Sequence, residues 1–143
     1  MKNYAYRNMI SNCNFTLQHY QDVLEFTKKK HTFQTFSEYQ KSENNVNVIL
    51  LRHDVDYSIE KAFDMAKLEN DIGIHSTYFI LLNSDFYNPN SSKNIKFLKQ
   101  ILQFGHEIGL HYDSNEILET QDPQKQLKEE IFKLEKLINQ KIF

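Results

Sequence analysis

Two short stretches of this sequence combine side chains that can bind a metal ion or move a proton. The first, RHDVD, contains Asp54 and Asp56, and the second, HEIGLHYD, contains His111 and Asp113. Within each stretch these side chains are two residues apart, which places them on one side of an extended chain. Carboxylate and imidazole groups suit zinc or a similar divalent ion, and a catalytic site needs about three such ligands with a position left open for water. One carboxylate would bind the metal while the other takes a proton from the attacking water.

The elements that must position these stretches follow an alternating pattern. Apolar, partly β-branched runs predict three strands, at Val48–Leu51, Ile74–Leu82 and His106–Tyr112. Apolar residues at helical spacing predict a helix after each strand, with N-caps at Ser58, at Ser91 or Ser92, and at Asp122 before Pro123, and with stops at Gly73 and Gly105. This order predicts an α/β fold of repeated βα units, with parallel strands flanked by helices. Parallel sheets of this kind place their chemistry at the carboxyl ends of the strands.

The section before the polar stretch Lys41–Asn47 has a different pattern. Apolar residues at helical spacing predict a helix over about Phe15–Lys30. The aromatic residues between positions 33 and 39 are expected to form part of the core or a lid over the sheet. We therefore divide the chain into an N-terminal helical or cap section, residues 1–45, and a βα section, residues 46–143.

Composition and charge exclude several classes of protein. With 143 residues, 40% hydrophobic residues and a net charge of -2, the chain fits one ordinary soluble domain. Cys13 is the only cysteine, so no internal disulfide can form. The chain has neither an apolar run of the roughly 20 residues that span a bilayer nor a secretory signal at its start, so we expect a cytoplasmic protein without a membrane partner. The near-neutral charge gives no electrostatic footprint for nucleic acid.

The segments LRHDVDYS, HSTYFIL and GHEIGLHYDS together resemble the polysaccharide deacetylase (NodB-homology) family, in the variant branch that carries His-Asp-x-Asp in its first motif. The resemblance covers about residues 46–115, and GHEIGLH is its most specific part. It implies a distorted (β/α) barrel that hydrolyses acetyl groups on a carbohydrate with the help of a metal ion, usually zinc. We therefore expect a carbohydrate substrate and a divalent metal cofactor, with zinc as the first candidate.

Residue by residue, the resemblance assigns roles to the two stretches. Asp54 matches the catalytic base and Asp56 a metal ligand, and the two roles remain exchangeable because one residue separates acids that are usually adjacent in the family. His111 matches the first of two metal-binding histidines. The partner position holds Asn115, an amide that replaces imidazole poorly, so Asp113 becomes the candidate for a further metal ligand.

The resemblance is also incomplete. The later motifs of the family, which supply an arginine, an acid and a further histidine, have no counterpart after Asn115. This implies a partial barrel that resembles the N-terminal half of the family fold, with its activity either retained or lost. The last strand of a half-barrel presents unpaired backbone groups, so we expect self-association or a second chain that completes the barrel.

Two other interpretations of the same residues stay open. The segment DVDYS after an apolar strand is also similar to the first motif of haloacid-dehalogenase-type phosphatases, in which Asp54 would be a phosphorylated nucleophile and Asp56 an acid or base. Ser84 and Asp85 fit the later requirements of that family poorly. The third interpretation is a non-catalytic, truncated interaction domain, in which the carboxylates cap a helix and His111 is a buried, hydrogen-bonded imidazole.

Overall fold

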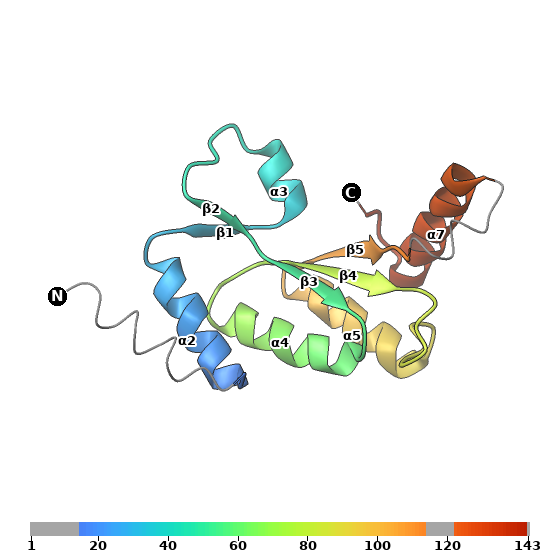
Figure 1. The fold of residues 1–143 in the computed structure, drawn as a ribbon, viewed down its shortest axis with the longest axis horizontal. Helices are drawn as coiled ribbons and strands as arrows, with labels where there is room; N and C mark the ends of the chain where they lie inside the picture. The colour runs from blue at the N-terminus through green and yellow to red at the C-terminus, as the bar shows by residue number, and fades with distance from the viewer. Residues whose placement is uncertain (1–14, 114–121, 143) are drawn as a thin grey trace.

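The computed structural model describes residues 15–113 and 122–142, so Cys13 lies outside the described ranges. The N-terminal part of the ribbon in Figure 1 contains α2 (Leu17–Lys28), β1 (Thr32–Gln34) and α3 (Phe36–Lys41). The part that follows contains β2 (Val48–Leu50), β3 (Arg52–Val55), α4 (Ile59–Asp71), β4 (Thr77–Leu81), α5 (Ser92–Gln103), β5 (Glu107–His111) and α7 (Pro123–Ile138). None of these described helices has the length and apolar character that crossing a bilayer requires.

The described strands form two small parallel sheets. β3, β4 and β5 make a three-stranded sheet in that order, and β1 pairs with β2 in a two-stranded sheet. The register aligns Asp54 with Phe79 and Phe79 with Gly109, so these three positions share one face of the larger sheet. This arrangement confirms the predicted α/β fold with parallel strands. The described strands form no closed barrel.

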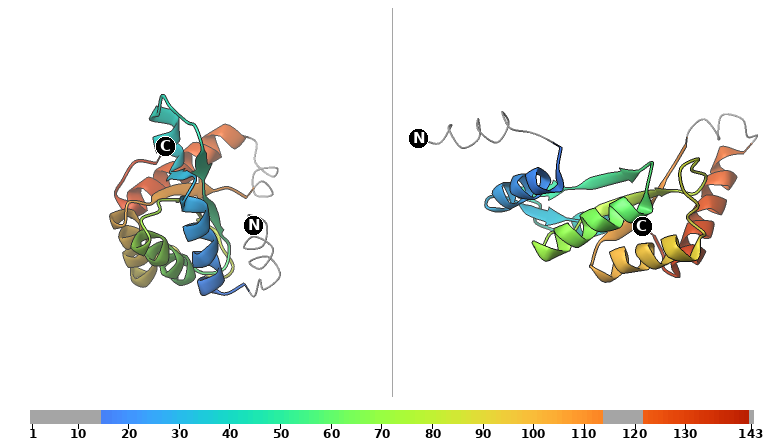
Figure 2. Two further views of the ribbon diagram at one scale, coloured as in Figure 1. Left: turned by 90° about the vertical axis from the view of Figure 1, so that its left-hand side faces the viewer. Right: turned by 90° about the horizontal axis from the view of Figure 1, so that it is seen from below.

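The hydrophobic core lies on one face of the three-stranded sheet. Val55, Tyr78, Ile80 and Ile108 point to this face, and buried residues of α4, α5 and α7 complete the core there. α4 and α5 lie side by side along this face in Figures 1 and 2. Each fully buried aliphatic side chain contributes roughly 1.5–3 kcal/mol because its apolar surface is removed from water. The opposite face carries Asp54 and is not covered by these helices.

The helices of the βα section begin and end where local sequence signals predict. Ser58, Ser91 and Asp122 are N-caps, and the side chain of each accepts a hydrogen bond from the backbone N–H three residues further on. Gly73 and Gly105 follow α4 and α5 with φ of 66° and 87°, a left-handed conformation that glycine adopts without steric cost. Because these signals act over a few residues, they can be identified without knowledge of distant contacts.

The strand boundaries differ from the prediction in a way that matters for the carboxylates. The first predicted strand does not end at Leu51, because the chain stays extended through β3. Asp54 therefore lies within a strand and not after it. Pairing with β4 gives the polar residues of β3 their backbone partners, and this tertiary contact outweighs their weak strand propensity. β4 is also shorter than the predicted strand Ile74–Leu82.

The sequence patterns do not predict β1 and α3. Both elements are short, and α3 begins at a capping box. Near the amino-terminal end of the larger sheet, the Ser37 hydroxyl donates a hydrogen bond to the Glu107 carboxylate of β5. The rings of Phe36 and Phe79 meet edge to face, with their centroids 5.7 Å apart. Phe36 thus covers part of the face opposite the core, as expected of a lid. β1 also joins the N-terminal section to the βα section by pairing with β2.

Candidate functional site

Three of the four predicted site residues come together at the carboxyl edge of the three-stranded sheet. Asp54 lies in β3, Asp56 follows β3, and His111 ends β5 on the other side of β4. His111 Nδ1 lies 3.3 Å from Asp56 Oδ1, and His111 Nε2 lies 3.9 Å from Asp54 Oδ2. The imidazole ring therefore stands between the two carboxylates, with one ring nitrogen facing each of them.

The register of the strands and one glycine explain how these side chains meet across β4. Leu81 of β4 is in register with His111, and Asp56 follows the last paired residue of β3. Asp56 and His111 therefore lie level with each other at the ends of their strands. Phe79 fills the sheet face beside them, and Gly109 leaves room for its ring, because a Cβ atom at Gly109 would lie 2.7 Å from a Phe79 ring carbon.

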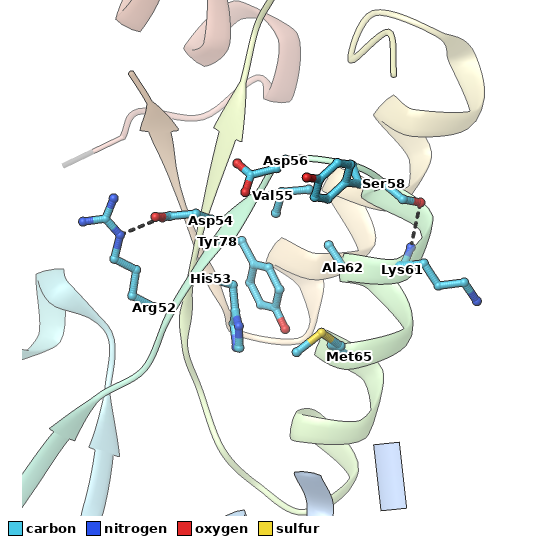
Figure 3. Close-up of a pocket in the computed structure, with 11 residues that line it drawn as sticks. Arg52, His53, Asp54, Val55, Asp56, Ser58, Lys61, Ala62, Met65 and Tyr78 are labelled. Atoms are coloured by element: carbon cyan, nitrogen blue, oxygen red, sulfur yellow. Dashed lines mark hydrogen bonds and ion pairs between the residues drawn. The ribbon is translucent and has the colours of Figure 1, made fainter. Parts of the chain in front are cut away.

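Solvent reaches the site from the face without core helices. The exposed fraction of the side chain is 38% for Asp54, 49% for Asp56 and 23% for His111. Arg52 Nε donates a hydrogen bond to Asp54 Oδ1 at 2.7 Å, as Figure 3 shows. The guanidinium of Arg52 also lies 4.5 Å from the centre of the Phe79 ring, in a cation–π contact. Asp54 thus has one oxygen held by Arg52 and the other directed to His111.

A hollow of about 420 Å³ adjoins this site along β3 and α4. Its lining residues in Figure 3 include Arg52, His53, Asp54, Asp56, Lys61, Ala62, Met65 and Tyr78. The rings of His53 and Tyr78 are stacked there, with their centroids 4.6 Å apart. The hollow thus lies on the α4 side of β3 and has a volume that holds a small ligand, while Figure 3 shows the Asp54 carboxylate directed to Arg52.

The chemistry of the cluster fits two ligands of a divalent metal ion. His111 Nδ1 is buried and has no hydrogen-bond partner, although Asp56 Oδ1 is 3.3 Å away. Two ligand atoms of one tetrahedral zinc ion lie roughly 3.3–3.6 Å apart, as follows from zinc–ligand bonds of about 2.0–2.2 Å. The spacing of these two atoms is therefore suitable for a shared metal ion, and a metal would give the buried nitrogen a partner.

A complete set of three metal ligands is not assembled among the described residues. In residues 15–113 and 122–142, no group of three His, Cys, Asp or Glu side chains is arranged to hold a metal ion. Asp113, predicted as a ligand, is exposed beyond the end of β5. Asn115 lies outside the described residues. Among the described residues, Asp56 and His111 are the pair whose spacing suits two ligands of one ion.

A second polar cluster, which the sequence patterns do not predict, lies on the core side of β3. Glu69 of α4 is fully buried, and its carboxylate accepts four hydrogen bonds. The donors are the Tyr20 hydroxyl, His53 Nε2 at 2.7 Å, Ser76 Oγ at 2.6 Å and the Tyr78 hydroxyl at 2.9 Å. A carboxylate has about four acceptor positions, so Glu69 is fully satisfied. The signal that identifies Glu69 in the sequence is its place on the buried stripe of α4.

The surroundings of Glu69 keep its carboxylate ionised. Burial by itself raises the pKa of Glu69, but the hydrogen bond and charge of His53, together with hydroxyl donors, outweigh burial and lower the pKa below its ordinary value. Burial and the nearby carboxylate raise the pKa of both bonded tyrosines far above the ordinary value, so their hydroxyls remain donors. His53 directly precedes Asp54 in β3 and points to the opposite face. The Glu69 cluster therefore anchors the strand that carries Asp54.

His106 belongs to the same buried region and has a structural role. Its Nε2–H donates to the Ala66 carbonyl oxygen at 2.8 Å, and its Nδ1 accepts from the Ser76 N–H at 3.2 Å. These two bonds assign the neutral tautomer that carries its proton on Nε2. Burial lowers the pKa of His106, and the hydrogen bond to Ala66 and the charge of Glu69 oppose this effect only in part.

The lowered pKa of His106 predicts a loss of stability in mild acid. The unfolded chain binds a proton at this histidine near its ordinary pKa of 6.5, whereas the folded protein binds it only at a lower pH. The contribution of neutral His106 to the free energy of unfolding is therefore complete above about pH 6.5. It is lost as the pH falls towards the pKa of His106 in the folded protein, by up to about 1.4 kcal/mol per pH unit. Urea unfolding at about pH 7.5 and about pH 5.5 measures this loss. His106→Gln should make the free energy of unfolding less dependent on pH, and an unchanged dependence would contradict the assignment.

Comparison of the chain with protein families, with curated proteins and with solved structures found no match. The function is therefore inferred from the chemistry of the site and from the resemblance of its motifs.

Proposed function

We propose that this chain is a metal-dependent hydrolase that removes acetyl groups from a carbohydrate, of the polysaccharide deacetylase type. The observation that carries the proposal is the imidazole of His111 between the carboxylates of Asp54 and Asp56, at the carboxyl edge of a parallel sheet. One imidazole and two carboxylates supply both metal ligands and a general base, the two kinds of group that metal-assisted hydrolysis of an acetyl group needs.

In this proposal Asp56 and His111 hold the metal ion and Asp54 is the general base. The 3.3 Å separation of Asp56 Oδ1 and His111 Nδ1 suits two ligands of one ion. A divalent ion such as zinc polarises the acetyl carbonyl and lowers the pKa of a water molecule when it is bound. Asp54 Oδ2 accepts the proton of the attacking water, while Arg52 holds Oδ1 and orients the carboxylate. Asp113, or a residue outside the described ranges, completes the ligand set.

The architecture supports a partial (β/α) barrel in this proposal. Three parallel strands stand next to one another with α4 and α5 on one face, which is the outer face of a barrel, and the candidate site lies on the other face. Among the described strands, β3 pairs only with β4, so its other edge has no strand partner there. Self-association or a second chain would cover this edge and the open face, because unpaired strand edges tend to recruit further strands.

Acetate release from acetylated chito-oligosaccharides tests the proposal. We expect the purified chain to release acetate with zinc present, to stop when a chelator removes the metal, and to recover when zinc is restored. Asp54→Asn should lower the rate at least about a hundredfold without loss of zinc, because a general base contributes roughly 10²–10⁴ to the rate. Asp71→Asn, at an exposed position that ends α4, is the matched control and should leave the rate unchanged. Full activity of Asp54→Asn would overturn the role of Asp54, and a zinc-loaded chain that releases no acetate would overturn the activity.

The placement of Asp54 and Asp56 two residues apart at the end of β3 favours the haloacid-dehalogenase-type phosphatase as the second candidate. Ser84 does not add to this, because its hydroxyl donates to the Asp56 carbonyl oxygen at 3.2 Å. In such an enzyme an Asp54 oxygen attacks phosphorus, the bond to the leaving group breaks, and Asp56 protonates the leaving oxygen. Incubation with acetyl phosphate and Mg²⁺ followed by mass spectrometry separates the two candidates. A phosphoryl group trapped on Asp54 would replace the deacetylase proposal, and an unmodified chain would leave it in place.

A further inference from the structure

A tyrosine from the loop between β4 and α5 bonds the ends of two strands next to the site. The Tyr87 hydroxyl donates to the Val55 carbonyl oxygen at 2.7 Å and accepts a hydrogen bond from the Leu81 N–H at 3.0 Å. Four residues earlier on both strands, the Thr77 N–H donates to the Leu51 carbonyl oxygen. By the same parallel register, the Leu81 N–H and the Val55 carbonyl oxygen face each other at the carboxyl end of the β3–β4 pair. The Tyr87 hydroxyl bonds both of these backbone groups.

We propose that Tyr87 is a positioning residue for the Asp56–His111 pair, an inference that rests on the proposed role of this pair as metal ligands. Val55 directly precedes Asp56, and Leu81 is in register with His111. One hydroxyl thus holds the backbone beside both side chains. The two ligand atoms are 3.3 Å apart. Because metal–ligand distances tolerate only about ±0.2 Å, a small movement of either strand end changes the fit.

The same loop also holds Asp56 from its other side. Ser84 Oγ donates to the Asp56 carbonyl oxygen at 3.2 Å, so two consecutive carbonyl groups of the chain are bonded to side chains of one loop. The Tyr87 ring packs against the core, and burial raises the pKa of Tyr87 to about 12, which keeps the hydroxyl protonated as a donor. Phenylalanine at position 87 would keep the ring packing and lose both hydrogen bonds.

NMR of the zinc-free Tyr87→Phe variant tests the role of the hydroxyl without reference to activity. We expect a folded protein whose Leu81 amide exchanges about tenfold faster, because this N–H loses a bonded partner. The imidazole resonances of His111 should also shift, because the Asp56 carboxylate beside the ring moves. The zinc affinity measured by calorimetry should fall about tenfold, as it does when groups that orient metal ligands are removed. Tyr39→Phe, at an exposed position of α3, is the matched control and should change none of the three quantities.

The outcomes separate the role of Tyr87 from the proposed function. His111 resonances that stay unchanged in folded Tyr87→Phe would overturn the positioning role. If Tyr87→Phe is unfolded in plain buffer, sucrose, which favours folded states, is added to it and to the wild-type chain, and the same His111 resonances decide. A wild-type chain that binds no zinc would contradict the metal-dependent function, whereas the His111 resonances of the zinc-free protein would still decide whether Tyr87 positions the pair.

Discussion

Replacement of His111 by alanine is expected to abolish stoichiometric zinc binding. His111 contributes the only imidazole to the cluster of described residues at this edge of the sheet, and its Nδ1 is the buried nitrogen that lacks a hydrogen-bond partner. Without it, Asp56 alone remains of the two ligand positions, and a single exposed carboxylate holds zinc weakly. We expect about one zinc per wild-type chain and an affinity at least about a hundredfold lower in His111→Ala, measured by elemental analysis after gentle purification and by calorimetry.

The control for this experiment is His19→Ala, which removes an imidazole of α2, whereas the candidate site is formed by β3, β5 and the residue after β3. It should leave zinc binding unchanged and so exclude adsorption of zinc to histidines at the surface. Retention of zinc by His111→Ala would show that the zinc is bound at another place in the protein. A folded wild-type chain that carries no zinc would instead favour the non-catalytic interaction domain.

The second large effect is expected from Glu69→Gln, which should lower the free energy of unfolding by about 3–5 kcal/mol. All four groups that bond the Glu69 carboxylate are donors. The amide of glutamine brings N–H donors of its own to these positions and removes the negative charge opposite His53. At least one donor then loses its acceptor, at a position where the Glu69 side chain itself is fully buried. Urea unfolding followed by circular dichroism measures the difference.

Glu129→Gln is the matched control for Glu69→Gln. The Glu129 side chain is 57% exposed and lies 4.0 Å from Lys125 on the surface of α7. Such pairs contribute little, so the free energy of unfolding should change by less than about 0.5 kcal/mol. A Glu69→Gln variant as stable as Glu129→Gln would mean that the buried carboxylate does not anchor β3. Loss of stability without loss of zinc affinity in the surviving folded protein would separate this anchor from the metal ligands.

The two clusters are connected through the alternation of side chains along β3. His53 and Asp54 are consecutive residues on opposite faces, so the bond of His53 to Glu69 restrains the backbone that carries Asp54. Tyr87 restrains the same strand at its end. The candidate site is therefore built on a strand with anchors on its core side and at its last rung, which is how a fixed geometry is maintained for exposed carboxylates.

Several features of the fold follow from short segments of sequence. The N-caps Ser58, Ser91 and Asp122 were predictable because a cap bonds an N–H only three residues away. The shared side of Asp54 and Asp56, and that of Gly109 and His111, follow from the alternation of an extended chain. That both pairs lie on the same face of the sheet depends on the register through β4. By contrast, the length of the first strand depends on pairing with β4, and weak local propensity could not predict it.

From its residues alone, this chain determined the alternation of strands and helices after residue 46, the N-caps and glycine stops of those helices, and the two stretches that carry carboxylate and imidazole groups. Only the tertiary structure decided that Glu69 is a buried anchor, that the Tyr87 hydroxyl bonds the last rung, and that each nitrogen of His111 faces a different carboxylate. The physical reason is distance along the chain. Caps and alternation act within a few residues, whereas the bond between Tyr20 and Glu69 joins residues 49 positions apart and forms only once the helices have packed against the sheet.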